Sequence, residues 1–445
     1  MLIIALVTCI ELCNSQVISA QSYDPSSDFA KEEDGRDPLG IFRNQFHNPV
    51  DEAGKPLIYF TGNSLGLQPV GARAHVLEIL ETWNTRGVDG YFSGPSPWLE
   101  YCDDLNRSMS VLVGADSTEV VLMNALTVNL HLLMATFYRP STDRYKVLVE
   151  QDAFPSDRYA IHSHVEWNGG DPEDSVLVLR PREGETLLRT DDIIKVIEES
   201  GSEIALVLLG GLNYYTGQLL DMEEITRVAR GAGCVVGFDL AHAAGNVGLQ
   251  LHDWDVDFAA WCTYKYLNGG PGSPGCIFIH TRHAADSNLP ALRGWWGQDT
   301  SDRFRMLDDY EPARGAQSFQ INNPALLSTA PLKASLDLFD AAGFPAILEK
   351  SRRLTGYLEF LLEKRLGGRV KIITPKNPDH RGAQLSIRID GGRNVFDTLN
   401  SFGVSCDWRE PGVIRMAPVP LYNSYLDVFN AVNALDEALS RTFGS

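Results

Sequence analysis

The chain has 445 residues, of which 44% are hydrophobic and 22% are charged, and its formal net charge is −20 at pH 7. This length is sufficient for one large core and a smaller domain, and the composition is ordinary for a soluble globular protein. The excess of negative charge argues against binding along a nucleic-acid backbone, which needs clustered Lys and Arg. We therefore expect no nucleic acid as a partner, and no membrane either, because the apolar run at residues 1–10 is too short to span a bilayer as a helix.

The first 27 residues are expected to be an extension of poorly defined structure. Residues 1–10 are apolar, but no basic residue precedes them and Glu11 ends the run, whereas a secretory signal peptide begins with positive residues. A true signal peptide and a wrongly assigned start are the alternatives. The seven cysteines, an odd number without CxxC spacing, are expected to be reduced thiols. Together these features favour a cytoplasmic protein.

Residues 28–70 are expected to form an N-terminal arm that belongs to the smaller domain. The arm is polar and acid-rich up to about residue 52, which favours a short helix and a loop. Residues 58–60 indicate a short strand, and a turn of Gly, Asn and Ser types follows it. Beyond the arm, apolar residues at 76, 77, 80 and 83 recur at helical spacing and predict a helix.

Residues 71–323 are expected to form the large domain. Between residues 119 and 260, apolar runs typical of strands (147–149, 176–179, 204–209 and 234–238) alternate with helical segments (193–199 and 222–232). The first two runs are unbroken, as in strands that are buried on both faces. Strands and helices that alternate with short connections predict an α/β fold with a mostly parallel sheet.

The C-terminal part is expected to be a smaller α+β domain. Residues 324–345 are expected to contain a linking helix, and an amphipathic helix follows at 347–366. Three β-rich segments come next, at 370–373, 384–389 and 413–416. We place the small domain at residues 346–445.

The densest chemical signal is Asp239 followed by Tyr264 and Lys265. Asp239 ends an apolar strand, where open α/β sheets bind their ligands. A carboxylate there can pair with the protonated pyridine nitrogen of pyridoxal phosphate. A desolvated lysine is a usable nucleophile for an aldehyde, and the glycine-rich residues 269–272 allow the backbone to approach a ligand closely. Taken singly, a strand-end Asp is more often a cap and a lone Lys is more often on the surface.

Two further segments point to the same cofactor. Thr127 is positioned at the start of a helix, and a hydroxyl at a helix N-terminus can bind phosphate. The alternative is that Thr127 is a plain N-cap. Phe154 follows a strand, so its ring could lie against a planar cofactor, although a proline-containing turn with a core phenylalanine has the same pattern.

Seven blocks of the sequence resemble kynureninase: TGNSLGLQP (61–69), NALTVNLHLLM (124–134), DAFPSDRYAI (152–161), YYTGQ (214–218), VGFDLAHAAGNVGLQLHDWDVDFAAWCTYKYLNGGPG (236–272), GWWG (294–297) and RMAPVPLYNS (415–424). The resemblance runs from about Asp28 to the end of the chain. It implies the fold type I of pyridoxal-phosphate (PLP) enzymes, class V of the aminotransferase superfamily, with a seven-stranded sheet. It also implies a homodimer with shared active sites.

The resemblance implies an activity and a role for each matching residue. The activity is hydrolysis of L-kynurenine or 3-hydroxy-L-kynurenine to L-alanine and anthranilate or 3-hydroxyanthranilate, in tryptophan catabolism and NAD biosynthesis. Lys265 would hold the cofactor as a Schiff base and move the α-proton, and Tyr264 would supply a proton. Arg415 would clamp the substrate carboxylate through its bidentate fork. The other residues implied to bind the cofactor are Leu126, Thr127, Phe154, Pro155, Ser156, Asp157, Gly210, Asp239, His242, Trp295 and Asn323, the last two from the other subunit.

Three positions depart from the family pattern. Gly210 stands where the animal enzymes have a serine that contacts the cofactor. Tyr91 stands where eukaryotic relatives carry a histidine that faces the substrate ring, and Asn322, before Asn323, replaces a small residue in the same pocket. The catalytic set is complete, so these differences concern the ring substituent that is preferred and not the reaction.

Two other functions would fit parts of the pattern. A cysteine desulfurase or an aminotransferase shares the fold, but the first needs a catalytic cysteine in a flexible loop, and no cysteine here lies in such a loop. A cofactor-free scaffold is the other alternative, and the joint presence of Lys265, Asp239, Thr127 and Arg415 argues against it.

Overall fold

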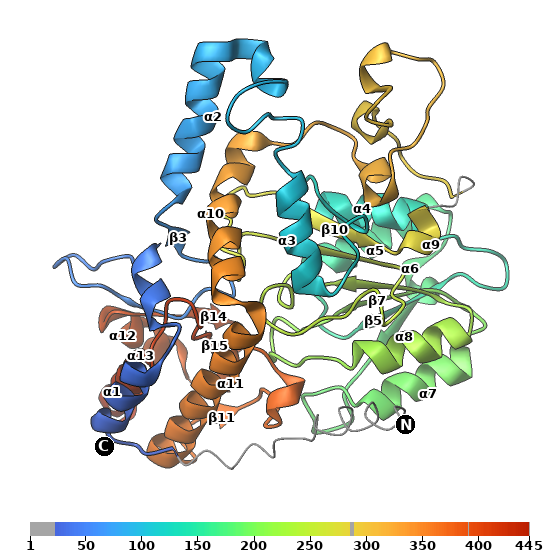
Figure 1. The fold of residues 1–445 in the computed structure, drawn as a ribbon. Coiled ribbons are helices and arrows are strands. Elements are labelled where there is room, and N and C mark those ends of the chain that lie inside the picture. Colours follow the sequence, from blue (N-terminus) through green and yellow to red (C-terminus); the bar gives the residue numbers. More distant parts are fainter. Residues whose placement is uncertain (1–22, 285–288, 390, 445) are drawn as a thin grey trace, which may run out of the picture.

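A computed structural model describes residues 23–284, 289–389 and 391–444 (Figure 1). The proposed extension up to residue 22, with its possible signal peptide and with Cys9 and Cys13, lies outside the described residues, so the cytoplasmic location stays a prediction. The five described cysteines are buried and free, as expected for reduced thiols. Among the described helices, none combines the length and the apolar character that crossing a membrane would require.

A seven-stranded sheet organises the larger part of the molecule. Its strand order is β4-β10-β9-β8-β7-β5-β6, and only β10 runs antiparallel to its neighbours. The strands are β4 (Val120–Leu122), β5 (Lys146–Glu150), β6 (Val176–Leu179), β7 (Ile204–Gly210), β8 (Val235–Asp239), β9 (Phe258–Cys262) and β10 (Gly275–Ile279). The predicted mostly parallel, seven-stranded α/β sheet is therefore confirmed.

Helices cover both faces of this sheet because its strands are apolar on both sides. In β7, Leu206 and Leu208 pack into one hydrophobic cluster, and Val207 and Leu209 pack into another. The first cluster contains α4 (Leu126–Phe137) and α5 (Pro155–Trp167). The second contains α3 (Asp103–Val113), α7 (Thr190–Ser200), α8 (Met222–Gly231) and α10 (Leu326–Ala342). Two short helices, α6 (Pro172–Ser175) and α9 (Thr281–Ala284), complete this part.

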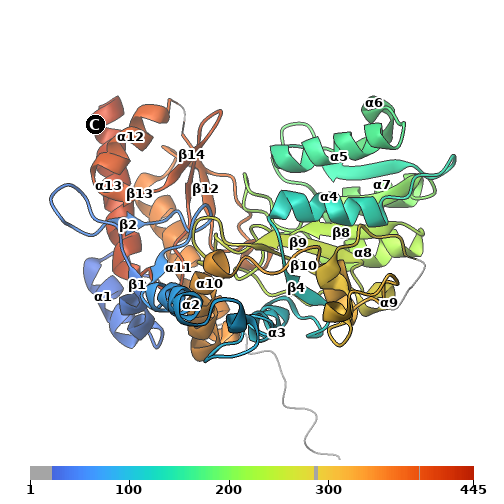
Figure 2. The ribbon, with the colours of Figure 1, turned by 90° about the horizontal axis from the view of Figure 1, so that it is seen from above.

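A second, four-stranded antiparallel sheet lies beside the part of the molecule that holds the seven-stranded sheet, to its left in Figure 2. Its order is β11 (Lys371–Ile372), β12 (Leu385–Arg388), β15 (Val413–Met416) and β14 (Asp407–Arg409). It shares a separate hydrophobic cluster with α11 (Phe344–Leu361), α12 (Arg393–Ser401) and α13 (Tyr425–Phe443). The amphipathic helix predicted at residues 347–366 corresponds to α11, which begins three residues earlier than expected. Its continuation, Leu362–Leu366, is a π-helix.

The N-terminal arm packs on this second unit. Its helix α1 (Ser27–Arg36) contacts α13, and β2 (Ile58–Tyr59) pairs with β13 (Val404–Ser405). Another short pair joins β1 (Phe46–His47) to β3 (Gln68–Pro69). The arm then leads into α2 (Ala72–Arg86), which confirms the predicted helix but leaves Leu77, Leu80 and Trp83 exposed. The proposed domain boundaries remain predictions.

Candidate active site

Lys265 lies in the loop between β9 and β10, beyond the carboxyl ends of the parallel strands. It lines a cavity of about 320 Å³. Its Nζ is 5.9 Å from the centre of the Phe154 ring and 6.0 Å from that of Tyr264. The N-terminal arm contacts this loop through Gly66, which donates its backbone N–H to the carbonyl of Tyr264. One amine therefore points into a cavity that is walled by two aromatic rings.

Two buried carboxyl groups face this amine. Asp239 ends β8 and accepts the backbone N–H of Ala241 at 2.7 Å, while Asp157 lies in the first turn of α5. Burial raises the pKa of Asp239, and its contact with Asp157 and the charge of Lys265 act against that rise. Burial and the charge of Asp239 raise the pKa of Asp157 well above its ordinary value. The pKa is raised more strongly for Asp157 than for Asp239, so within the pair the proton favours Asp157 and the negative charge favours Asp239.

Glu150 is a third buried carboxyl group, which the sequence analysis did not single out. It ends β5, lines the same cavity, and accepts the backbone N–H of Gly210 at 3.1 Å with each oxygen. Burial, with a smaller contribution from the charge of Asp239, raises the pKa of Glu150 to about 7. A β-carbon at Gly210 would lie 2.8 Å from Glu150 Oε1, so a side chain at position 210 would displace the carboxyl group.

Two helix N-termini meet at one end of the cavity. Leu126 begins α4 and Pro155 begins α5, and the hydroxyl oxygens of Thr127 and Ser156 are 2.6 Å apart. Thr127 is the second residue of α4 and the N-cap position is Ala125, so the alternative of a plain N-cap is wrong. Helix N-termini carry partial positive charge and free N–H groups, which suits a phosphate group.

Phe154 immediately precedes α5, and Pro155 occupies the first turn of that helix. The Phe154 ring is 45% exposed and packs edge-on against Tyr214 at 5.3 Å between centres. The alternative of a turn with a core phenylalanine is therefore wrong. The ring remains available to a planar ligand in the cavity.

Arg415, on β15, is fully buried in the opposite wall of the cavity. It donates from Nε to Asp407 at 2.6 Å, from Nη1 to the carbonyl of Tyr214 at 2.7 Å, and from Nη2 to Ser64 Oγ at 3.0 Å. Burial would raise the pKa of Asp407, but Arg415 and Ser64 outweigh burial and the pKa is lowered. The Arg415 guanidinium, which was expected to present a free bidentate fork to the substrate, therefore already uses that fork to bind Asp407. Arg409, on β14, lines the same cavity.

Four predicted site residues form a second group away from Lys265. Asn323 donates to the Tyr91 hydroxyl at 3.1 Å. Trp295, which is 45% exposed, packs edge-on against Phe304. In the described part of the chain, neither these residues nor Asn322 line the Lys265 cavity. Within one chain the structure therefore does not bring the expected aryl pocket and the lysine together.

The cavity fits pyridoxal phosphate on two structural observations. First, Asp157 Oδ1 and His242 Nδ1 are buried and have no hydrogen-bond partner among the described residues, so both await a polar ligand group. Burial, and then the charge of Lys265, hold the pKa of His242 well below its ordinary value, which keeps the imidazole neutral. Second, the converging helices offer a phosphate cradle beside an amine that can bind an aldehyde. Leu126, Thr127, Phe154, Ser156 and Asp239 complete the lining that would hold the group.

The fold and this lining are those of a fold-type-I PLP enzyme. Among solved structures, the chain is similar to the cysteine desulfurase CsdA of Escherichia coli, with a TM-score of 0.71 and 19% identity over 91% of this chain and 98% of that one. A cysteine desulfurase of Thermococcus onnurineus gives 0.69 and 18% over 86% and 95%. At these identities the likeness concerns the fold alone.

Sequence comparison identifies the family. The kynureninase of Koribacter versatilis is 51% identical over 93% of this chain and 98% of its own length, and that of Myxococcus xanthus is 50% identical over 93% and 97%. The kynureninase C-terminal domain matches residues 347–435. The chain therefore belongs to the kynureninase family, and the resemblance that was inferred from the seven sequence blocks is confirmed.

The contact between the arm and the lysine loop can be tested with Gly66→Ala. A β-carbon at Gly66 would lie 2.4 Å from the carbonyl oxygen of Lys265 and 2.8 Å from Cα of Asn268, so backbone must move. We expect a loss of about 1–3 kcal/mol in unfolding free energy and weaker cofactor retention. Gly35→Ala, at a helical position where no described neighbour lies within 4 Å, is the control and should stabilise the protein slightly. Equal effects of the two substitutions would contradict this account.

The raised pKa of Glu150 predicts a pH-dependent loss of stability in the apoprotein. The folded state holds its proton up to about pH 7, whereas the ordinary value is 4.5. Folding therefore takes up a proton between these values, and stability falls as the pH rises through them, by about 3 kcal/mol in all. Urea unfolding at pH 5 and pH 8 should show this loss in the wild type, and the loss should be smaller by about 3 kcal/mol in Glu150→Gln, where only the other buried carboxyl groups still contribute. An unchanged pH dependence in that variant, matching the exposed control Glu166→Gln, would refute it.

Proposed function

We propose that this protein hydrolyses L-kynurenine, 3-hydroxy-L-kynurenine or a ring-substituted kynurenine with pyridoxal phosphate as cofactor. The products are L-alanine and the corresponding anthranilate, so the enzyme would act in tryptophan catabolism and NAD biosynthesis. The observation that carries the proposal is Lys265 facing the Asp239–Asp157 pair in a cavity whose other wall holds Arg415. The kynureninases that are about 50% identical over nearly the whole chain support the same reaction.

Pyridoxal phosphate, when bound, supplies an electron-withdrawing ring that makes cleavage of bonds at and next to the substrate Cα possible. Asp239 keeps a negative charge in a buried position and so favours a protonated ring nitrogen. Asp157 supports that charge, because it carries the proton that the pair shares. Thr127 and Ser156 hold the phosphate end with the backbone N–H groups of α4 and α5.

The protein residues also account for proton movement. Lys265 is the one amine that lines the cavity within the described residues, and we assign it the proton transfer at the substrate Cα. Tyr264 lies beside it, and burial raises the pKa of its hydroxyl, which therefore stays protonated and can donate. In the overall reaction, water contributes OH to the γ-carbonyl carbon and the β-carbon gains H as the Cβ–Cγ bond breaks.

Arg415 and its neighbours bind the substrate carboxylate in this proposal. The ion pair with Asp407 fixes the guanidinium, and Arg409 adds a second positive group to the same wall. Burial, and then the charge of Arg415, lower the pKa of Arg409, so an anionic substrate group relieves the repulsion between the two arginines.

Lys265→Ala should abolish hydrolysis of kynurenine, because both the nucleophile for the aldehyde and the proton-transfer group are lost. The measurement is release of alanine and anthranilate, identified by mass spectrometry, with protein folding checked by circular dichroism. Alanine release from cysteine, run in parallel, tests the desulfurase alternative. Undiminished turnover of kynurenine by this variant would disprove the assignment.

We further propose that the enzyme is a homodimer with shared active sites. The described residues that line the Lys265 cavity of the same chain do not include Tyr91, Asn322, Asn323 or Trp295. Aromatic side chains connect Trp295 to Tyr91 in a continuous series. Trp295 contacts Phe304, Phe304 contacts Phe92, and Phe92 contacts Tyr91. Exposed side chains extend this surface along and beyond α2: Leu77, Leu80, Trp83 and Val88. A large exposed apolar patch is typical of a protein–protein interface.

Hybrid dimers test the shared site directly. Lys265→Ala and Asn323→Ala chains should each form poorly active homodimers, whereas a hybrid of the two contains one site with both residues intact. Co-expression with two different affinity tags allows the hybrid to be isolated and assayed. Recovered activity in the hybrid is the expected result, and activity no higher than that of the two homodimers would overturn the proposal.

The altered aryl pocket should set the preferred ring substituent. Tyr91 offers a hydroxyl, which already accepts from Asn323, and Asn322 adds an amide beside it. Discrimination by such groups ranges from about 1–3 kcal/mol in an apolar pocket to more where a hydrogen bond is lost. We expect Tyr91→His to change the ratio of kcat/KM for 3-hydroxykynurenine over kynurenine. An unchanged ratio would show that position 91 does not read the ring.

A further inference from the structure

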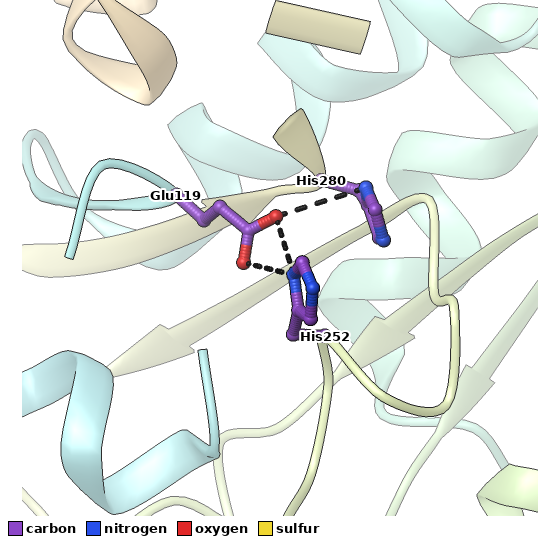
Figure 3. A group of neighbouring side chains, drawn as sticks. All are labelled: Glu119, His252 and His280. Carbon is purple, nitrogen blue, oxygen red and sulfur yellow. Dashed lines mark hydrogen bonds and ion pairs between the residues drawn. The ribbon is translucent and has the colours of Figure 1, made fainter. Parts of the chain in front are cut away.

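A second cluster of chemically competent side chains lies at the edge of the large sheet away from Lys265. Glu119 immediately precedes β4, and His280 immediately follows β10 (Figure 3). These strand ends meet because β10 runs antiparallel to β4, with Phe278 opposite Val120. His252 reaches the same point from the loop that precedes β9. Lys265 follows the other end of β9, so the two sites are on opposite edges.

The three donor groups have the spacing of metal ligands. One donor atom from each residue lies within 4.8 Å of the others. Nδ1 of His252 is 3.0 Å from Glu119 Oε1, and Nδ1 of His280 is 3.7 Å from the same oxygen. The two imidazole rings are stacked, with an interplanar angle of 16°. Two histidines and a glutamate are a known ligand set for Zn²⁺, whose bonds to them are about 2.0–2.2 Å long.

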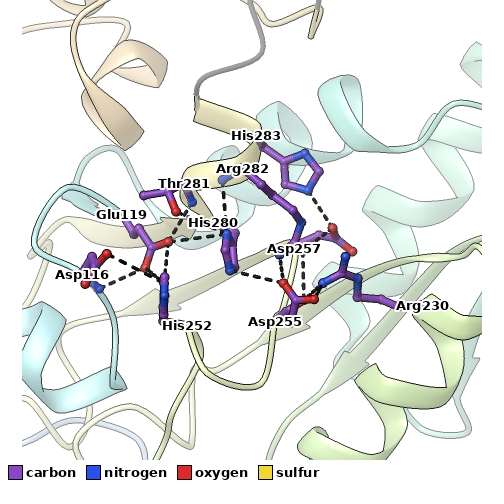
Figure 4. Close-up of polar contacts among 10 residues, drawn as sticks. All are labelled: Asp116, Glu119, Arg230, His252, Asp255, Asp257, His280, Thr281, Arg282 and His283. Carbon is purple, nitrogen blue, oxygen red and sulfur yellow. Dashed lines mark hydrogen bonds and ion pairs between the residues drawn. The ribbon is translucent and has the colours of Figure 1, made fainter.

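The tautomer of His280 fits this role. The backbone N–H of Arg282 donates to its Nδ1 at 3.2 Å, so Nδ1 carries a lone pair and the ring proton is on Nε2. Nε2 faces Asp255 Oδ1 at 3.3 Å (Figure 4). Metal-binding histidines usually donate their other N–H to a carboxylate in this way, which fixes ring and tautomer. An ion at Nδ1 would displace the Arg282 contact.

Two backbone hydrogen bonds fix the orientation of the Glu119 carboxylate. This buried carboxylate accepts the backbone N–H groups of Thr281 at 2.7 Å and Asp116 at 3.0 Å. The edge of the cluster is open to solvent: the His252 side chain is 37% exposed. The carboxylate of Asp116, also exposed, lies 4.0 Å from His252 Nδ1. An ion could therefore enter, and Asp116 or water could complete four-fold coordination.

We propose that Glu119, His252 and His280 bind one divalent cation of the zinc class. The ion replaces the hydrogen bond from His252 to Glu119 and ties the ends of β4 and β10 to the loop before β9. β4 leads directly to Leu126 and Thr127 at the start of α4, so the ion would brace the strand that carries the phosphate-binding helix. Its role is structural, and the proposal does not depend on which reaction the enzyme performs.

The test is a titration of the chelator-treated holoenzyme with ZnCl₂, followed by calorimetry and by thermal unfolding. We expect one equivalent of Zn²⁺ per chain and a rise in Tm, because an ion that binds only the folded state stabilises it. Co²⁺ in place of Zn²⁺ should give the visible absorption of a tetrahedral N/O site. Absence of stoichiometric binding, or an octahedral cobalt spectrum with no change in Tm, overturns the proposal.

Variants locate the ion. His252→Asn removes a ligand at the open edge, where folding is not at risk, and Glu119→Gln removes the central carboxylate; each should weaken Zn²⁺ binding about tenfold or more. His164→Asn is the matched control, because His164 belongs to the other close histidine pair, with its Nε2 3.2 Å from His131 Nδ1. Binding that survives in His252→Asn but is lost in His164→Asn would place the ion elsewhere and refute the site.

Discussion

The buried charges around Lys265 are the constraint on which the rest of the molecule depends. A carboxylate or an ammonium group that is taken out of water is costly unless it is paired and hydrogen-bonded. Here burial raises the pKa of both Asp239 and Asp157 while Lys265 faces them, and burial, followed by the positive charges of Lys265 and Arg415, lowers the pKa of His242. The strands, helix N-termini and glycines around the cavity place these groups where such an arrangement can exist.

The second unit of the fold contributes to the same balance of charge. Arg415 is completely buried, and it is accommodated because Asp407, Ser64 and the carbonyl of Tyr214 accept its N–H groups. These partners come from β14, the N-terminal arm and the large unit. The ion pair therefore both binds the parts of the chain together and presents positive charge to the cavity. Gly66 also joins parts of the chain, because its backbone N–H connects the N-terminal arm to the lysine loop.

The parallel core could be predicted well because its strands are unbroken apolar runs bounded by polar turns. β6 was predicted with its exact ends, and β5, β7 and β8 to within two residues. β9 (Phe258–Cys262) and β10 (Gly275–Ile279) were not placed individually, although their apolar runs are of the same kind as those of the strands that were placed. α13 was also missed, although Ser424 and Asp427 form a capping box that could have located its start.

Asp239 and Lys265 were predictable from position, because strand ends of an open α/β sheet converge on one edge. The partners of Arg415 were not, since Ser64 is 351 residues away in sequence and only the folded chain joins them. Glu150 was missed because a strand-end glutamate has no distinguishing pattern. The Tyr91 group belongs to an exposed surface, whose function depends on what packs against it, and neither motif nor spacing encodes that.

The central claim is that Lys265 holds the cofactor opposite Asp239. The most direct test is reduction of the purified holoenzyme with borohydride, followed by digestion and peptide sequencing by mass spectrometry. The account predicts that one pyridoxyl group per chain is attached, and that it is found on the peptide containing Lys265. A pyridoxyl group on a different lysine, or a protein that binds pyridoxal phosphate without forming a reducible bond to Lys265, would contradict it.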